Sequence, residues 1–231
     1  MIVAVTVGTI IQSSIGFGLA LVVVPTLTLI RPDALPATIL LIALPMTTFM
    51  ALRERRSIDV AGLRRAAAAR LPGTLAGVML LAYVPDDSLS VVIGSLIIVA
   101  AGISALRPQL EVGRGTSLVA GFASGLMGTA AGIGGPPMAL AYQRRPGGEL
   151  RATLAGIFVL GSLMSLAGLG LSGRVHGRHI LLALELLPGI GAGLLLSRHT
   201  ARLLDGGWVR AAVVAFAAVT GATGVLEGLT G

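Results

Sequence analysis

The sequence contains no cysteine and no lysine, and only 12% of its 231 residues are charged. Without cysteine the chain can form no disulfide and offers no thiolate to a metal ion. It has no Walker loop, no HExxH sequence and no nucleophile elbow, which counts against both ATP-driven transport and hydrolysis. A membrane-embedded enzyme would need a buried acid–base or metal cluster, and the sequence does not supply one. We therefore expect that the protein is not an enzyme and needs no cofactor.

Apolar residues dominate what remains. They make up 55% of the chain, and the mean hydropathy of +0.93 is far above what a soluble domain can bury. The net charge is +7, and all 17 basic residues are arginine. These arginines lie between long apolar runs rather than in a stripe with aromatic residues, so they indicate membrane topology and not a nucleic-acid surface. The composition predicts an all-α, multi-pass membrane protein surrounded by lipid.

Eight apolar segments follow one another along the chain, and most approach the roughly 20 residues that cross a bilayer as a helix. They cover residues 1–30, 34–52, 66–84, 89–106, 116–142, 151–171, 180–197 and 208–229. The first and the fifth segments are too long for one span. Each has glycines near its middle, IGFG at 15–18 and GIGGPP at 132–137, and such clusters break a helix.

The two halves of the chain repeat each other. LPGTLAGVML at 71–80 aligns with LPGIGAGLLL at 187–196, an offset of 116 residues (187 minus 71). The same offset places Gly16 on Gly132 and Gly18 on Gly134. The sequence therefore predicts two repeats, 1–115 and 116–231, each with one long broken segment followed by three ordinary helices.

The arginines favour one topology for the broken segments. If 116–142 crosses the membrane once, the arginines divide almost evenly between the two sides. If it enters and leaves by the same face as a hairpin, 14 arginines share one side and only Arg31, Arg174 and Arg178 lie opposite. The positive-inside rule favours the hairpin, which makes the two repeats inverted. Eight plain spans with parallel repeats are the alternative, because long helices can tilt.

Two Gly-rich stretches carry a family resemblance, SSIGFGLALVVVP at 13–25 and MGTAAGIGGPPM at 127–138. Together with the duplicated halves, they make the chain resemble the TauE/SafE family of sulfite exporters. The resemblance implies a transporter of sulfite, an organosulfonate or a related small anion, acting in export across a bacterial inner (plasma) membrane. The second stretch has the denser Gly-Pro cluster, so it is the stronger candidate for the binding site.

A helix broken inside the membrane exposes backbone N–H groups at the start of its second half, together with the positive end of the helix dipole. Glycines let an oxyanion approach that backbone, and prolines suit the first helical turn. We expect an anion site built from neutral donors, without a buried arginine. Its candidate residues are Gln12, Ser13, Ser14, Gly16, Phe17, Gly18, Thr38, Thr129, Gly132, Ile133, Gly134, Gly135, Pro136 and Thr153. In the alternative interpretation the glycines only pack helices together and the hydroxyls bond their own backbone. For the pairs Gly73/Gly77, Gly121/Gly125 and Gly189/Gly193, each at four-residue spacing, helix packing is the favoured interpretation.

The charged residues near the apolar segments allow two interpretations each. Glu185 could carry a proton in a coupled cycle, or it is an interfacial carboxylate paired with Arg174 or Arg178. Arg70 ends the basic run 53–70, which is expected to lie on anionic lipid headgroups. Arg70 could attract substrate, although a side chain that snorkels to the interface is the favoured interpretation.

His176 and His179 have a spacing found in metal sites, but no third ligand is close in sequence, so we expect no metal. The sequence predicts a carrier with alternating access, and an anion or small-solute channel of the same architecture is the alternative. It leaves open the exact substrate, the coupling ion, and whether the chain works as a monomer or a homodimer.

Overall fold

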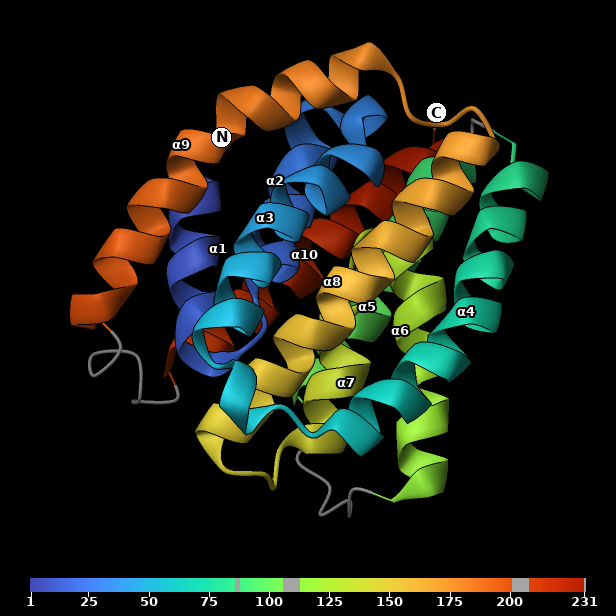
Figure 1. Ribbon diagram of the computed structural model, residues 1–231. Coiled ribbons are helices and arrows are strands. Elements are labelled where there is room, and N and C mark those ends of the chain that lie inside the picture. Colours follow the sequence, from blue (N-terminus) through green and yellow to red (C-terminus); the bar gives the residue numbers. More distant parts are fainter. Residues whose placement is uncertain (86–87, 106–112, 201–207, 231) are drawn as a thin grey trace.

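The computed structural model describes residues 1–85, 88–105, 113–200 and 208–230 (Figure 1). This part of the chain is helical and contains no strand, as predicted. The α-helices are α1 (Ile2–Ile15), α2 (Leu19–Ile30), α3 (Ala37–Arg53), α4 (Val60–Tyr83), α5 (Leu89–Ala105), α6 (Arg114–Ala130), α7 (Gly135–Tyr142), α8 (Gly147–Leu171), α9 (Gly177–Thr200) and α10 (Trp208–Thr230). Two short 3-10 helices, η1 (Pro32–Ala34) and η2 (Arg55–Ser57), lie in the links on either side of α3.

Glycines break both long segments where the sequence predicts. Gly16 ends α1 in the left-handed conformation with φ 93°, and its N–H bonds to the carbonyl of Gln12. Gly18 has φ 134°, and α2 begins directly after it. In the second segment Gly132 has φ 76°, and α7 begins at Gly135. Side chains disfavour these positive φ values, so glycine is required at these three turns.

Each broken segment folds back on itself. In Figure 1, α1 runs from the N-terminus toward the lower part of the view and α2 returns beside it. α6 starts at the lower end and α7 returns there. The two helix pairs therefore point into the bundle from opposite ends.

The halves contact each other reciprocally. α4 packs along α6, and its counterpart in the second half, α9, packs along α1. α3 packs on α8 and α5 packs on α10, so helices at equivalent places in the two predicted repeats also meet. The larger contacts between the halves thus have counterparts when the halves are exchanged.

Small residues allow these helices to approach closely. A Cβ on Gly77 would lie 2.8 Å from the carbonyl oxygen of Leu126, and one on Gly189 would lie 2.9 Å from the carbonyl oxygen of Ile2. The packing role expected for the glycine pairs is therefore confirmed. These pairs are Gly73/Gly77, Gly121/Gly125 and Gly189/Gly193.

The outer surface of the bundle is apolar and part of its interior is polar. Val119 is 72% exposed and Leu181 64% exposed, whereas Thr38 and Thr129 are completely buried. Three helices are long and apolar enough to cross a membrane, namely Val60–Tyr83, Gly147–Leu171 and, within α9, Gly177–Ser197. Several shorter helices are also apolar. A soluble protein would not leave this much apolar surface in water, so the chain is a membrane protein.

One expectation about the last residue of the basic run 53–70 is wrong. α4 begins at Val60, and its first part packs into the bundle. Arg64 is exposed, but Arg70, near the middle of α4, is only 2% exposed. Arg70 therefore does not snorkel to the interface.

Candidate functional site

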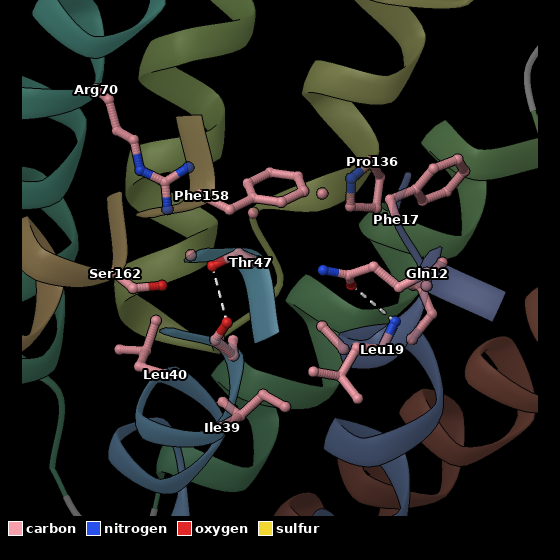
Figure 2. Close-up of a pocket in the computed structure, with 18 residues that line it drawn as sticks. Gln12, Phe17, Leu19, Ile39, Leu40, Thr47, Arg70, Pro136, Phe158 and Ser162 are labelled. Carbon is pink, nitrogen blue, oxygen red and sulfur yellow. Dashed lines mark hydrogen bonds between the residues drawn. The ribbon is translucent and has the colours of Figure 1, made fainter. Parts of the chain in front are cut away.

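The two helix breaks meet around a small internal pocket of about 50 Å³. Figure 2 shows Phe17, from the first break, and Pro136, from the second, on the same side of this pocket. α3, α4 and α8 supply the other walls. The pocket therefore lies at the junction of the two halves.

Half of the candidate site residues line the pocket. They are Gln12, Phe17, Gly18, Gly132, Gly134, Gly135 and Pro136. Both breaks contribute, and the second break contributes more of them. The structure thus brings together the two Gly-rich stretches that lie far apart in sequence.

The other candidate side chains do not line the pocket. Ser14 donates to the carbonyl of Ile10 in its own helix, as the alternative interpretation expects. Thr129 shares a 2.7 Å hydrogen bond with Ser165. Thr153 accepts a hydrogen bond from the backbone N–H of Asp59.

Four candidates remain, and they also lie outside the pocket. Ser13 and Thr38 have buried hydroxyls without a hydrogen-bond partner among the described residues. Ile133 belongs to the apolar core. Gly16 packs against Leu150 at the start of α8.

The start of α2 is capped by a side chain from the preceding helix. The Gln12 side-chain oxygen accepts a hydrogen bond of 3.1 Å from the N–H of Leu19. This bond satisfies a donor that helix geometry would otherwise leave free. It also turns the amide nitrogen of Gln12 toward the interior of the pocket, where it can donate to a ligand (Figure 2).

The start of α7 keeps its donors free. The N–H groups of Gly134 and Gly135 have no hydrogen-bond partner among the described residues. Pro136 and Pro137 follow in the first turn and have no N–H group to satisfy. The positive end of this helix therefore faces the pocket with two backbone donors.

Arg70 belongs to the pocket wall, although the sequence suggested it only as a residue that could attract substrate and favoured snorkelling. It lines the pocket from α4, and its Nη1 lies 2.5 Å from the hydroxyl of Ser124 on α6. Ser124 in turn donates to the carbonyl of Gly134 at 2.6 Å. Arg70 is thus connected through one serine to the second helix break, and the expectation of a site without a buried arginine is wrong.

Three glycines make room for the guanidinium group of Arg70. A Cβ on Gly161 would overlap its Nε and Cζ atoms. A Cβ on Gly128 would lie 2.7 Å from Nη2, and one on Gly134 would lie 3.2 Å from Nη1. These glycines come from α6, the second break and α8, so three separate elements shape the place of one charged group.

The charge of Arg70 has no counterion among the described residues. The ion pairs there involve other arginines, and the Nε of Arg70 is buried without a hydrogen-bond partner. A buried unpaired charge is strongly unfavourable unless a ligand compensates it. Leu186 occupies the equivalent position in the second half (70 plus 116) and is packed in the core at 2% exposure. The fold itself therefore does not require an arginine at this position.

A sequence signal could have identified Arg70. The buried face of α4 includes Arg70, Gly73, Thr74, Gly77 and Leu81. Arg70 lies about one helical turn before Gly73 and Thr74, on the same face of α4 as these small residues. That spacing indicates that its side chain points into the bundle. Two further pocket side chains, Thr47 and Ser162, carried no such signal in the sequence.

The remaining titratable candidates lie outside this pocket. Glu185 is exposed on α9, and the ion pair expected for it with Arg178 is absent because Arg178 pairs with Asp33. His176 and His179 lie in a different cavity. In the described parts of the chain, no group of three or more His, Asp or Glu residues is placed to hold a metal ion.

Apolar helices around a buried polar pocket, with two broken helices meeting at its wall, form the architecture of a membrane transport protein. The specific group follows from comparison with known proteins. The family model described as sulfite exporter TauE/SafE matches residues 1–224, so the chain belongs to this family.

One curated relative extends this comparison. A protein of Cupriavidus necator named probable sulfite/organosulfonate exporter TauE is 26% identical over 203 residues, which are 83% of this chain and 79% of that protein. No solved structure matches the chain.

Proposed function

We propose that the protein carries a small sulfur oxyanion across the membrane and binds it in the pocket beside Arg70. The main supporting observation is the buried guanidinium group of Arg70, which has no counterion among the described residues and lines the same pocket as Gly134 and Gly135, whose N–H groups have no partner there. An oxyanion would satisfy all three groups at once, because its oxygens accept charge-assisted hydrogen bonds. Family membership and the name of the curated relative support the same substrate class.

The size of the pocket favours the smallest members of that class. A volume of about 50 Å³ is a few times the minimum that holds one water molecule. Sulfite, with one sulfur and three oxygens, matches this room. An organosulfonate has the same head group plus a carbon chain, which would meet the rings of Phe17 and Phe158. We therefore propose sulfite as the preferred substrate.

The proposed topology is an inverted repeat in which each broken segment is a re-entrant hairpin. The helix pairs α1–α2 and α6–α7, which point into the bundle from opposite ends, support it, as do the reciprocal contacts between the halves. The arginine-rich end carries Arg55, Arg56 and Arg145, and by the positive-inside rule it faces the cytoplasm. The two halves then rock about the central pocket and expose it alternately to each side.

The membrane potential favours export. With the inside negative, it drives each anionic charge outward by about 2.3 kcal/mol per 100 mV. A coupled proton is not required for net export under these conditions. Transport in either direction through the same site follows when the gradients are reversed.

Counterflow in proteoliposomes tests this function. Vesicles preloaded with unlabelled sulfite should accumulate ³⁵S-labelled sulfite transiently, with saturation, and Arg70→Leu should abolish the uptake. Arg64→Gln is the matched control, because Arg64 lies on the same helix and is exposed. Uptake that does not saturate, together with single-channel currents, would refute the carrier and favour the channel. Normal counterflow in Arg70→Leu would refute the site.

A further inference from the structure

A second, larger cavity lies at the end of the bundle opposite the arginine-rich end. Its volume is about 470 Å³. Its walls come from η1, the C-terminal part of α4, the first turn of α5, and the link between α8 and α9. His176 and His179, whose spacing in the sequence occurs in metal sites, lie in this cavity.

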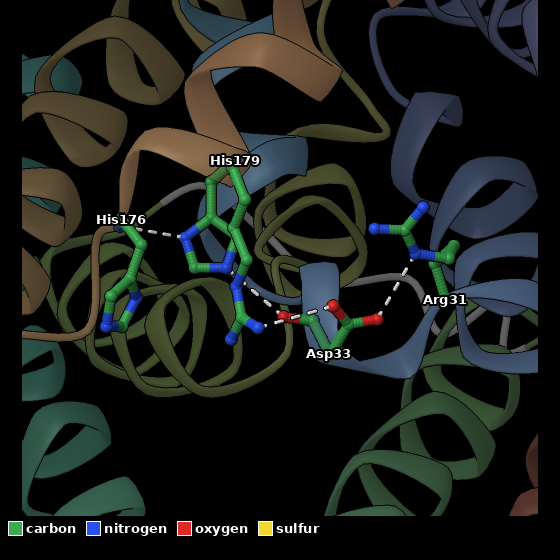
Figure 3. A network of polar contacts seen from close by, with 5 residues as sticks. Arg31, Asp33, His176 and His179 are labelled. Atoms are coloured by element: carbon green, nitrogen blue, oxygen red, sulfur yellow. Dashed lines mark hydrogen bonds and ion pairs between the residues drawn. The ribbon is translucent and has the colours of Figure 1, made fainter.

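Asp33 holds the wall of this cavity together (Figure 3). One carboxylate oxygen lies 3.4 Å from Nε of Arg31, and the other lies 3.7 Å from Nη1 of Arg178. The backbone carbonyl of Asp33 lies 3.2 Å from Nε2 of His179. Nδ1 of His179 accepts the N–H of His176 at 3.1 Å, so Nε2 carries the proton and donates to Asp33. These contacts join the first half to the second half at this end.

The charges around the cavity are mainly positive. Both oxygens of Asp33 already face arginines, so this carboxylate does not neutralise the remaining groups. Arg174 lines the cavity, donates to the backbone carbonyl of Leu81, and has no acidic partner among the described residues. Ser90, in the first turn of α5, adds a hydroxyl beside the positive end of that helix. Asp86 and Asp87 precede α5 and lie outside the described residues.

One apolar cluster lies between this cavity and the central pocket. Leu40 lines the central pocket, and Leu81 lines the outer cavity. Both are almost completely buried, and they pack in the same cluster with Ala130 and Leu169. An anion that leaves the central pocket toward this end must displace these side chains.

We propose that the outer cavity is a second binding site for the transported oxyanion, occupied after the anion has passed the layer formed by Leu40 and Leu81. Arg174 and the ring of His176 bind the anion there. Asp33 and His179 stabilise the cavity wall through their contacts with each other and with Arg178. The apolar layer formed by Leu40 and Leu81 separates the two sites, because burying a charged ligand among apolar side chains is energetically costly. This proposal rests on the proposed function and deepens it, since it adds a release site on the outward side.

The absence of cysteine gives a direct test in the intact protein. Ser90→Cys places a single thiol in the cavity. Its reaction rate is compared for an anionic sulfonate reagent, 2-sulfonatoethyl methanethiosulfonate, and the matched cationic reagent that carries a trimethylammonium group. A positive cavity should favour the anionic reagent, and sulfate, which does not react with either, should slow its reaction. Adding Arg174→Gln should lower the rate ratio severalfold, because the loss of one positive charge weakens the attraction of the anionic reagent and the repulsion of the cationic one.

Arg64→Gln is the charge-matched control, because Arg64 is exposed on α4 and does not line the cavity. It should change the ratio much less than Arg174→Gln does. A ratio that favours the cationic reagent, or no protection by sulfate, would overturn the proposal.

Failure of the second-site proposal can be distinguished from failure of the proposed transport function. Arg70→Leu should abolish sulfite counterflow and leave the ratio at position 90 unchanged. If the wild-type protein shows no counterflow while the ratio and the protection hold, the transport proposal fails and the anion site stands.

Discussion

The guanidinium group of Arg70 lies 2.5 Å from the hydroxyl of Ser124, and this contact joins α4 of the first half to α6 of the second. The hydroxyl of Ser124 in turn donates a hydrogen bond to the carbonyl of Gly134, directly before α7 begins. Ser124 therefore links the positive charge of Arg70 to the backbone at the start of α7, where the N–H donors lie. A change at any of these three residues should affect the other two.

Arg70→Leu should separate function from stability. Without the guanidinium group, sulfite affinity should fall by at least about 30-fold, the equivalent of about 2 kcal/mol for a buried charge pair that loses one partner. The anion-free protein should be as stable as the wild type or more stable, because a buried unpaired charge is replaced by an apolar side chain. Leu186 shows that a leucine fits the equivalent position. Thermal unfolding with and without sulfite measures both effects, and a large loss of stability without anion would contradict the assignment.

Ser124→Ala should weaken binding without abolishing it. The variant leaves Nη1 of Arg70 and the carbonyl of Gly134 without their shared partner, and one such loss costs about 1–3 kcal/mol. We expect the KM for sulfite counterflow to rise about tenfold. Ser14→Ala is the control, because its hydroxyl bonds only its own helix. An equal effect of both substitutions would show that Ser124 has no special role.

Gly134→Ala should impair transport through steric conflict. The added Cβ would lie 2.8 Å from the carbonyl oxygen of Ser124 and 3.2 Å from Nη1 of Arg70. Since the backbone at Gly134 or at Ser124 must shift, we expect at least a tenfold loss in initial counterflow rate, and Gly134→Val should abolish transport. Gly102→Ala on α5 meets no atom within 4 Å. That control should transport normally and gain about 0.5–1 kcal/mol of stability.

Phe158→Ala should broaden the substrate range. Phe158 lines the central pocket at 8% exposure, and removal of its ring extends the space beside the proposed anion site. The variant should transport isethionate or sulfoacetate, which the wild type should transport poorly, and it should retain sulfite counterflow at reduced temperature. The lost packing should lower stability by about 3–5 kcal/mol. Phe122→Ala, at a ring that is 42% exposed on α6, serves as control. Wild-type protein that transports sulfoacetate as well as sulfite would contradict the size argument.

The topology can be tested with single cysteines and an impermeant maleimide. Arg56→Cys and Arg144→Cys should react from the same side, because the segment between α5 and α8 enters and leaves by one face. Ser172→Cys should react only from the other side. All three positions are exposed. Labelling of position 144 from the side opposite position 56, with position 172 reacting from the same side as position 56, would favour eight plain crossings.

The sequence was most informative about the helices and their interruptions. The hydropathy segments match the described helices closely, because a helix in lipid must be apolar over a fixed length. The breaks at Gly16–Gly18 and Gly132–Gly134 were also predictable, since few residues other than glycine adopt their backbone angles. The duplicated register, the family and the close-packing glycines followed from the same local patterns.

The position of Arg70 was not predictable in this way. The segment expected at 66–84 placed Arg70 near a helix end, where snorkelling is the ordinary outcome. In the structure α4 begins at Val60, so this residue lies deep in the bundle on the face that packs against α6. Which side of a helix faces a neighbour depends on contacts between residues far apart in the chain.

The sequence by itself therefore determined that this is a helical membrane protein with two Gly-rich breaks, because hydropathy and backbone conformation are local properties. The two repeats stay a prediction from the sequence. Only the tertiary structure decided that the breaks meet at one pocket, that Arg70 rather than a set of neutral hydroxyls faces it, and that two leucines lie between it and a second cavity. The physical reason is that an anion site depends on charge and donors brought together from α1, α4, α6 and α7. No single segment contains enough of these groups to reveal the site.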